Sequence, residues 1–179
     1  MHKDVESILV SENEINEIVA HMADKINKDL NNEPLLVVII LKGSTPFAMD
    51  LIRKLDMPVE IDFMQVSSYG KSTESNGFIN VKRDLDQNVT GKNILIVEDI
   101  IDSGNTLHKI KALFQERNAK TVRICTMLDK PSRRVVDVNV DYVGKEIPDE
   151  FAIGYGLDYC EQYRNLPYVG VLKRSVYEK

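Results

Sequence analysis

The chain has 179 residues, of which 43% are hydrophobic and 28% charged, enough for one α/β domain with a sizeable core. Its 28 acidic residues outnumber 23 Lys and Arg, giving a net charge of −5, so the composition provides no electrostatic reason to expect a nucleic-acid partner. The longest apolar run, residues 35–41, is too short to cross a membrane, and the N-terminus has no apolar signal segment. Cys125 and Cys160 are isolated, which favours neither disulfides nor zinc. We therefore expect a single cytoplasmic domain.

The first elements predicted along the chain are a helix and a strand-loop-helix unit. Residues 11–14 read Ser-Glu-Asn-Glu, a capping box that opens an amphipathic helix. The apolar run 35–41 predicts a buried strand, and the loop after it contains Lys42 and Gly43 before a second helix with Thr45 as its N-cap. A helix N-terminus at the carboxyl end of a parallel strand attracts anions, so this loop is a candidate phosphate site.

Two alternating segments, residues 59–66 and 78–84, predict a pair of antiparallel strands. The segment between them is rich in Ser, Gly, Thr and Asn and has too few apolar residues to pack. It is equally consistent with a flexible lid over a site and with a long hairpin tip.

Residues 94–107 carry the strongest functional signal. The β-branched run 94–97 predicts a strand buried on both faces, which leads to Glu98 and Asp99 at the sheet edge where open α/β proteins bind ligands. We expect these carboxylates to be displayed rather than buried. Residues 102–106 then supply hydroxyls, a glycine and backbone N–H groups at the start of a helix, where a phosphate fits. Acids beside a phosphate site indicate a ligand that also carries hydroxyls or a cation, such as a ribose phosphate with Mg²⁺.

The remainder of the chain predicts one more parallel strand, residues 121–128, and then short strands near 142–143, 151–155 and 168–172. Lys130 follows the parallel strand at the ligand edge, where it can donate to a carbonyl oxygen. Phe151 offers an aromatic face to a planar base, although its residue type alone favours a core position.

Two stretches resemble a known family. Residues 94–106, a hydrophobic run followed by Glu-Asp-Ile-Ile-Asp-Ser-Gly-Asn-Thr, are similar to the phosphoribosyl-pyrophosphate (PRPP) signature of the type I phosphoribosyltransferases. Residues 148–168, with Pro-Asp-Glu-Phe, Gly-Tyr-Gly-Leu-Asp-Tyr and Tyr-Arg-Asn-Leu-Pro-Tyr, resemble the base-binding hood of the hypoxanthine-guanine phosphoribosyltransferases. The resemblance covers nearly the whole chain.

The resemblance implies the type I phosphoribosyltransferase fold, an α/β architecture in a single domain over residues 1–179. Its parallel sheet core, flanked by helices, would span about residues 11–130. A small hood would combine N-terminal residues with about 131–179, and a flexible two-stranded lid would lie at 67–77. Family members are homo-oligomers, and the sequence does not decide between a dimer and a tetramer.

The resemblance also implies roles for individual residues. Asp102 would act on the N7 proton of the purine, as general base or hydrogen-bond acceptor. The peptide bond before Lys42 is often cis in this family. Asp102 would also belong to the PRPP-binding residues, with Glu98 and Asp99 on the ribose hydroxyls and Ser103, Gly104, Asn105 and Thr106 on the 5′-phosphate. Pyrophosphate would be bound by Lys42, Gly43 and Arg164, and Mg²⁺ by Glu98, Asp99 and Asp158. The purine would be bound by Lys130, Phe151 and Ala152, and the lid would contain Ser68 and Tyr69.

The activity implied is purine salvage: transfer of the 5-phosphoribosyl group from PRPP to hypoxanthine or guanine, with Mg²⁺ as the cofactor. One alternative is a regulatory nucleic-acid-binding protein that uses the fold to sense PRPP. Two features of the chain oppose that alternative. The net charge is acidic, and the chain has Asp102, Lys130, Phe151 and Asp158, which a protein that only binds PRPP would not need. A second alternative is a relative that prefers xanthine or orotate. The 6-oxo edge is common to hypoxanthine and guanine, so the sequence does not rank them.

Overall fold

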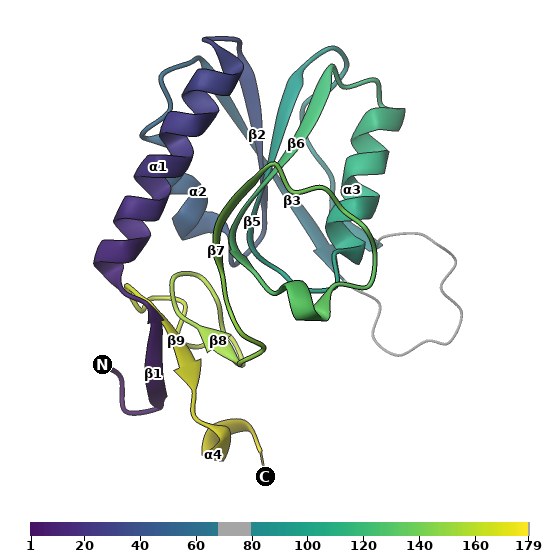
Figure 1. Ribbon diagram of the computed structural model, residues 1–179. Helices are drawn as coiled ribbons and strands as arrows, with labels where there is room; N and C mark the ends of the chain where they lie inside the picture. The colour runs from purple at the N-terminus through teal and green to yellow at the C-terminus, as the bar shows by residue number, and fades with distance from the viewer. Residues whose placement is uncertain (68–79, 179) are drawn as a thin grey trace.

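The computed structural model describes residues 1–67 and 80–178 (Figure 1). Its elements, in chain order, are β1 (Val5–Val10), α1 (Glu12–Leu30), β2 (Leu35–Ile40), α2 (Thr45–Ile52), β3 (Val59–Ser67), β4 (Asn80–Arg83), β5 (Asn93–Ile101), α3 (Asn105–Glu116), β6 (Thr121–Asp129), a 3₁₀ turn (Pro131–Arg133), β7 (Tyr142–Glu146), β8 (Ala152–Ile153), β9 (Val169–Leu172) and α4 (Arg174–Tyr177). Among the described residues, no helix is long and apolar enough to cross a membrane.

The core is a six-stranded sheet with the order β4-β3-β2-β5-β6-β7. All neighbouring pairs are parallel except β3 with β4, which is antiparallel. Helices α1 and α2 cover one face of the sheet and α3 covers the other (Figure 1). This is the expected architecture of a parallel core flanked by helices, and the antiparallel β3–β4 pair is also as expected.

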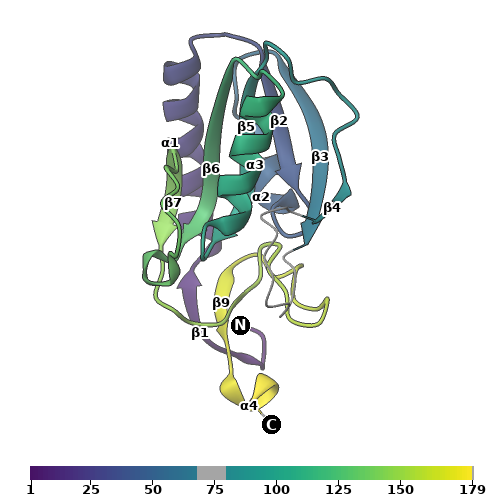
Figure 2. The same cartoon turned by 90° about the vertical axis from the view of Figure 1, so that its right-hand side faces the viewer.

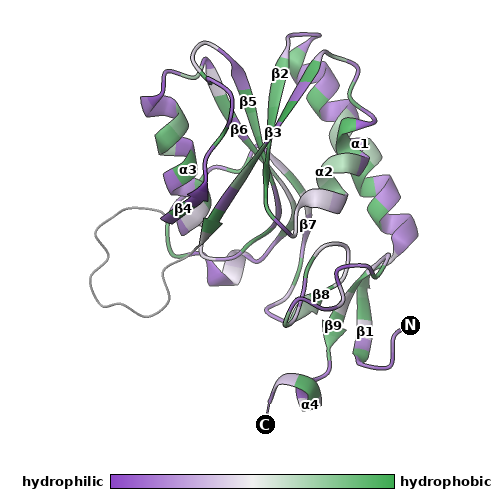
Figure 3. Cartoon of the chain, turned by 180° about the vertical axis from the view of Figure 1, so that it is seen from behind, coloured by the Kyte–Doolittle hydropathy of each residue, from purple (hydrophilic) through white to green (hydrophobic). Residues whose placement is uncertain are grey.

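The central strands β2 and β5 are apolar on both faces because both faces are covered. In β2, Val37 and Ile39 pack with α1 and α2, whereas Leu36 and Val38 pack with α3. Successive side chains of a strand point to opposite faces, so a continuous apolar run satisfies both layers at once. Figure 3 shows this distribution: hydrophobic residues concentrate in the central strands and on the inner faces of the helices.

The first helix begins as its sequence predicts. The Ser11 side chain accepts a hydrogen bond from the Glu14 backbone N–H, and the Glu14 carboxylate accepts one from the Ser11 N–H, which completes the capping box. Hydrogen bonds from Ser11, followed by the hydrogen bond and charge of Lys145, lower the pKa of Glu14 to about 2. The helix therefore starts at a fixed point, directly after β1.

A second, three-stranded sheet with the order β1-β9-β8 forms the hood. It lies beyond the carboxyl ends of the core strands, as Figures 1 and 2 both show. The first strand of the chain therefore pairs with the last one, with Val5 opposite Leu172 and Val10 opposite Val169. The hood sheet therefore combines residues from the N-terminal and C-terminal parts of the chain.

Three predicted boundaries differ from the structure. The N-cap of α2 is Ser44, and Thr45 is the first helical residue. Strand β5 continues to Ile101 instead of ending at residue 97, because its pairing with β6 continues to Ile101 opposite Asp129. Strand β7 belongs to the core sheet, because Tyr142 to Glu146 pair in parallel with β6. The core thus extends past the expected limit near residue 130.

Candidate functional site

Two cavities open where the carboxyl ends of the core strands face the hood. The first has a volume of about 440 Å³ and the second about 400 Å³. Ile100, Asp102 and Asp158 line both of them. The two cavities therefore adjoin, and a ligand that fills one can reach the other.

The first cavity brings together residues from three separate parts of the chain. The loop after β2, the end of β5 with the loop into α3, and the hood all contribute. Predicted site residues lining it are Lys42, Gly43, Glu98, Asp99, Asp102, Ser103, Gly104, Thr106, Asp158 and Arg164. The peptide bond between Leu41 and Lys42 is cis.

The carboxylate pair Glu98 and Asp99 lies within β5 and is half-buried, which corrects the expectation that both are displayed at a strand end. Burial raises the pKa of Glu98 well above its usual value, and the neighbouring Asp99 charge adds to the effect. Burial also raises the pKa of Asp99, opposed by hydrogen bonding and by the charge of Arg164. Two adjacent, partly desolvated carboxylates favour a ligand that brings positive charge or hydroxyl donors.

Gly43 is required by the close approach of Asp99. A Cβ at residue 43 would lie 1.6 Å from the Asp99 Oδ2 atom. A Cβ at Gly156, whose φ is +99°, would lie 1.8 Å from the Gly43 carbonyl oxygen. The hood loop and the core loop therefore touch through backbone atoms at two glycines, one of which has a left-handed conformation.

Arg164 is held at the edge of the first cavity by several oxygens. Its guanidinium donates to the Gly156 carbonyl at 2.7 Å and forms an ion pair with Asp158 at 2.8 Å. Glu161 pairs with Arg164 at 3.3 Å and with Lys42 at 3.0 Å, which links the hood to the core loop. The Arg164 Nε is buried and has no hydrogen-bond partner within the described residues. A donor left in this state favours an additional acceptor, such as an anion.

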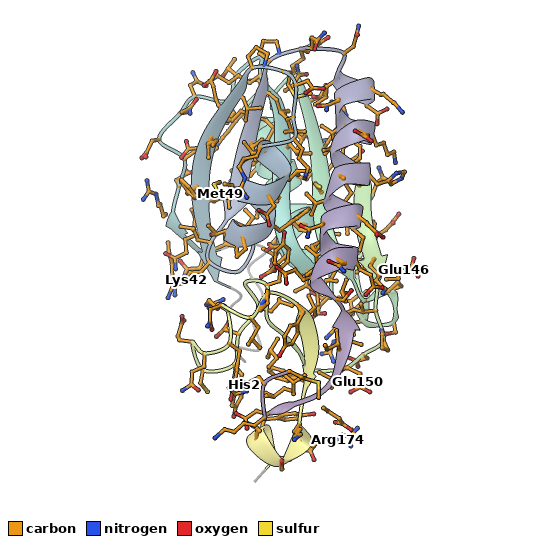
Figure 4. All side chains as sticks on the ribbon, turned by 90° about the vertical axis from the view of Figure 1, so that its left-hand side faces the viewer. His2, Lys42, Met49, Glu146, Glu150 and Arg174 are labelled. Atoms are coloured by element: carbon orange, nitrogen blue, oxygen red, sulfur yellow. The ribbon has the colours of Figure 1, made fainter. Side chains whose placement is uncertain are left out.

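Figure 4 shows how these elements face one another. Lys42 lies at the end of the core that faces the hood, and Glu150 and Arg174 lie in the hood itself. The residues that line the two cavities come from both the core and the hood.

The loop into α3 lines the first cavity with Ser103, Gly104 and Thr106, whereas Asn105 does not line it. Gly104 is the N-cap of α3, with φ at +81°, and has no side chain to cap the helix, while the Ser103 hydroxyl accepts a hydrogen bond from the Asn105 N–H at 3.4 Å. The Ser103 carbonyl accepts hydrogen bonds from the N–H groups of Val135 and Val136, and these bonds hold the loop in place. Asn105 begins the helix and donates from its amide to the Ser103 hydroxyl at 3.3 Å. An uncapped helix N-terminus leaves backbone N–H groups for an anion.

Lys130 lies in the second cavity and is 7% exposed. Its ammonium donates to the Glu150 carbonyl at 2.8 Å. Asp102 and Asp149 are its nearest carboxylates, at 3.8 and 3.9 Å. Because an ammonium has three N–H donors, Lys130 keeps donating capacity toward the cavity while one bond fixes its position.

Phe151 is 37% exposed and lines the second cavity with Ala152. Its ring lies outside the core, contrary to what its residue type alone favours. Sequence reasoning did not select several other residues that line this cavity, namely Ile100, Arg133, Asp149, Glu150, Leu157 and Tyr177. Ile100 is one of the two apolar residues inside the Glu-Asp-Ile-Ile-Asp signature, so the motif could have indicated that it lies at the site. Nothing in the sequence indicated that Tyr177, near the C-terminus, would reach the site.

The metal assignment is only partly supported by the geometry. Glu98, Asp99 and Asp158 line the same cavity. Over residues 1–67 and 80–178, however, no group of three or more His, Cys, Asp or Glu side chains gathers closely enough to hold a metal ion alone. Mg²⁺ is commonly held by one or two carboxylates together with substrate phosphates, and the pair Glu98 and Asp99 fits that pattern. The predicted lid residues Ser68 and Tyr69 lie outside the described residues.

Comparison with known proteins identifies the family. The model of the phosphoribosyl transferase domain matches residues 7–160. The chain is 51% identical over 178 residues to the hypoxanthine-guanine phosphoribosyltransferase of Bacillus subtilis, covering 99% of each protein. It is 50% identical over 179 residues to the enzyme of the same name from Staphylococcus epidermidis, covering 100% of each. The chain therefore belongs to the phosphoribosyltransferase family.

Solved structures agree in fold. A hypoxanthine phosphoribosyltransferase from Staphylococcus aureus has a TM-score of 0.95 and 47% identity, covering 100% of this chain and 97% of that one. A hypoxanthine-guanine phosphoribosyltransferase from Bacillus anthracis has a TM-score of 0.90 and 48% identity, covering 94% of this chain and 99% of that one. The expected type I phosphoribosyltransferase fold is thus confirmed.

The contact between Gly43 and Asp99 gives a first testable prediction. Gly43→Ala should lower the free energy of unfolding by about 1–3 kcal/mol, because the added methyl forces the loop and the carboxylate apart. The control is Lys42→Ala, which removes only an exposed ion pair and should cost less than about 1 kcal/mol. Urea unfolding of the three proteins measures both values. Equal stability of Gly43→Ala and the wild type would contradict the close contact.

Proposed function

We propose that the chain catalyses transfer of the 5-phosphoribosyl group from PRPP to hypoxanthine or guanine. The products are inosine or guanosine monophosphate and pyrophosphate. The observation that carries the proposal is the joining of two chemically different cavities at Ile100, Asp102 and Asp158. One suits a sugar phosphate and the other a 6-oxopurine, and the reacting bond would lie where they meet.

The first cavity accounts for the donor substrate. The backbone N–H groups and hydroxyls of residues 103–106 would hold the 5′-phosphate at the N-terminus of α3. Glu98 and Asp99 would accept hydrogen bonds from the ribose hydroxyls. Lys42, the Gly43 backbone and Arg164 would hold the pyrophosphate, and the position of all three residues on the wall of the first cavity supports this role. PRPP would then be held at its 5′-phosphate and at its pyrophosphate, with ribose C1 facing the second cavity.

The cation expected with PRPP would be held by the first cavity. Glu98 and Asp99, with Asp158 on the pyrophosphate side, are the side chains available to it. When bound, Mg²⁺ neutralises the leaving pyrophosphate and orients it. Such a cation would offset part of the electrostatic cost of two adjacent half-buried carboxylates, and this supports the assignment.

The second cavity accounts for the acceptor. Phe151 would stack on the purine, while Lys130 would donate to the 6-oxo oxygen. The backbone at Ala152 would face the N1 and C2 side of the base. Ile100, which lines both cavities, would contact the purine close to the ribose. Hypoxanthine and guanine share the edge that Lys130 recognises, and therefore both are proposed as substrates.

Asp102 is the residue placed to handle the proton at N7 of the purine. It lines both cavities, and its carboxylate is 48% exposed, within 3.8 Å of the Lys130 ammonium. As N9 of the base attacks ribose C1, positive charge develops on the imidazole ring of the purine. A carboxylate that accepts the N7 proton relieves this charge in the transition state.

The alternative functions receive less support. A nucleic-acid-binding regulator needs a basic surface, whereas Lys and Arg here pair widely with acids, as in Arg117 with Asp84 and Lys120 with Glu33. The similar curated proteins are named for hypoxanthine and guanine rather than xanthine or orotate. The subunit number, a dimer or a tetramer, is left to measurement of the molar mass in solution.

The proposal is tested by measuring nucleotide formation from PRPP and Mg²⁺ with hypoxanthine, guanine, xanthine and adenine. We expect turnover of hypoxanthine and guanine and poor use of adenine.

Lys130→Met should raise the KM for hypoxanthine about 10- to 100-fold, the value of a charged hydrogen bond, and should reduce the preference for hypoxanthine over adenine. Arg133→Ala, which removes a neighbouring cation of the same cavity, is the control. Absence of turnover with every 6-oxopurine would refute the function.

Replacement of the proposed base should affect the chemical step. Asp102→Asn should lower kcat by about 10²- to 10⁴-fold, with much smaller changes in the KM values. Asp149→Asn is a matched control, because Asp149 lies at 3.9 Å from the same ammonium and is similarly exposed, and its kcat should change by less than about fivefold. An unchanged kcat of Asp102→Asn at saturating substrates would remove Asp102 from this role.

The raised pKa values of Glu98 and Asp99 predict a pH dependence of donor binding. Both carboxylates must be ionised to accept ribose hydroxyls or hold a cation, so the KM for PRPP should rise as the pH falls toward their raised pKa values. PRPP also titrates in acid, and Glu98→Gln therefore provides the control. Its KM should be higher at neutral pH and should depend less on pH than that of the wild type. Identical pH profiles would contradict the assignment.

A further inference from the structure

The C-terminal helix α4 brings Tyr177 to the second cavity, and none of the roles above uses this residue. Tyr177 lines the cavity together with Phe151 and Lys130. Its ring stacks on that of Phe151, with the centroids 5.0 Å apart and the planes at 30°. The ring that we assign to purine stacking is therefore itself stacked on a tyrosine.

A third ring completes the arrangement. Tyr159 contacts Phe151 edge to face at 5.6 Å and 87°, and lies 6.5 Å from Tyr177 at 61°. These are favourable aromatic geometries. One neighbour on a face and another at the edge together restrain both the position and the plane of the Phe151 ring. Without them, a ring that is 37% exposed would be free to reorient.

The backbone fixes Tyr177 relative to Phe151. The Leu172 N–H donates to the Phe151 carbonyl at 2.8 Å, and Ala152 pairs with Val171 in the β8–β9 ladder. Helix α4 follows β9 after a single residue, Lys173. The hydrogen bonds that build the hood sheet thus also determine where Tyr177 meets Phe151.

We propose that Tyr177 is a purine-positioning residue. It holds the Phe151 ring in the orientation that stacks on the base, and its own ring closes one side of the cavity. This inference rests on the proposed function. A stacking surface that is already ordered binds a planar base more tightly, since less side-chain freedom is lost on binding.

The experiment compares Tyr177→Ala, Tyr177→Phe and Val176→Ala by steady-state kinetics with hypoxanthine and PRPP. Tyr177→Ala should raise the KM for hypoxanthine about five- to tenfold, the value of an aromatic pair, and leave the KM for PRPP within about twofold. Tyr177→Phe should behave as the wild type, because the Tyr177 hydroxyl has no hydrogen-bond partner among the described residues. Val176 packs in the hood core without lining the cavity, so Val176→Ala controls for loosening of α4.

An unchanged KM for hypoxanthine in Tyr177→Ala would overturn the inference, as would an equal rise with Val176→Ala or an equal rise for PRPP. If Tyr177→Ala does not fold, Tyr177→Leu keeps the burial without the ring, and the same comparison decides. The wild type separates the two claims. A wild type inactive on 6-oxopurines refutes the proposed function, whereas an active wild type with an unaffected Tyr177→Ala refutes only the role of Tyr177.

Discussion

The parallel pairing of β5 with β2 on one side and β6 on the other is the constraint on which the rest of the structure depends. Parallel strands end at the same edge of a sheet, so this pairing gathers three loops that are far apart in the chain. The loop after β2 brings Lys42 and Gly43, the end of β5 brings the carboxylates and the phosphate loop, and the end of β6 brings Lys130. The pairing of these strands therefore determines which functional side chains meet at their carboxyl ends.

The hood is joined to the core by loop contacts and by apolar residues, such as Ala152 and Val169, that belong to the main core cluster. Gly156 of the hood meets Gly43 of the core loop, and Glu161, which also pairs with Arg164, forms an ion pair with Lys42. Because β1 pairs with β9, both ends of the chain are needed to complete the layer that carries Phe151. The layer that carries Phe151 is thus held against the core by loops from both units.

Much of the architecture was predictable from local patterns. The capping box at Ser11 and the two-faced apolar run of β2 depend on nearest neighbours in the chain, and both are found as predicted. The end of β5 was not predictable, because hydrogen bonds to β6 continue the strand through Glu98 and Asp99 despite their charge. Their partial burial, and the close contact of Asp99 with Gly43, arise from this extension. Tyr177 could not be foreseen, since only the pairing of β8 with β9 brings it to Phe151.

We expect one nucleotide to span both cavities, with its phosphate on the loop before α3 and its base on Phe151. A crystal structure with inosine monophosphate tests this most directly. We predict the 5′-phosphate against residues 103–106, the ribose beside Glu98 and Asp99, and the 6-oxo oxygen within hydrogen-bond distance of the Lys130 ammonium. A phosphate bound elsewhere, or a base outside the cavity formed by Lys130 and Phe151, would contradict the account.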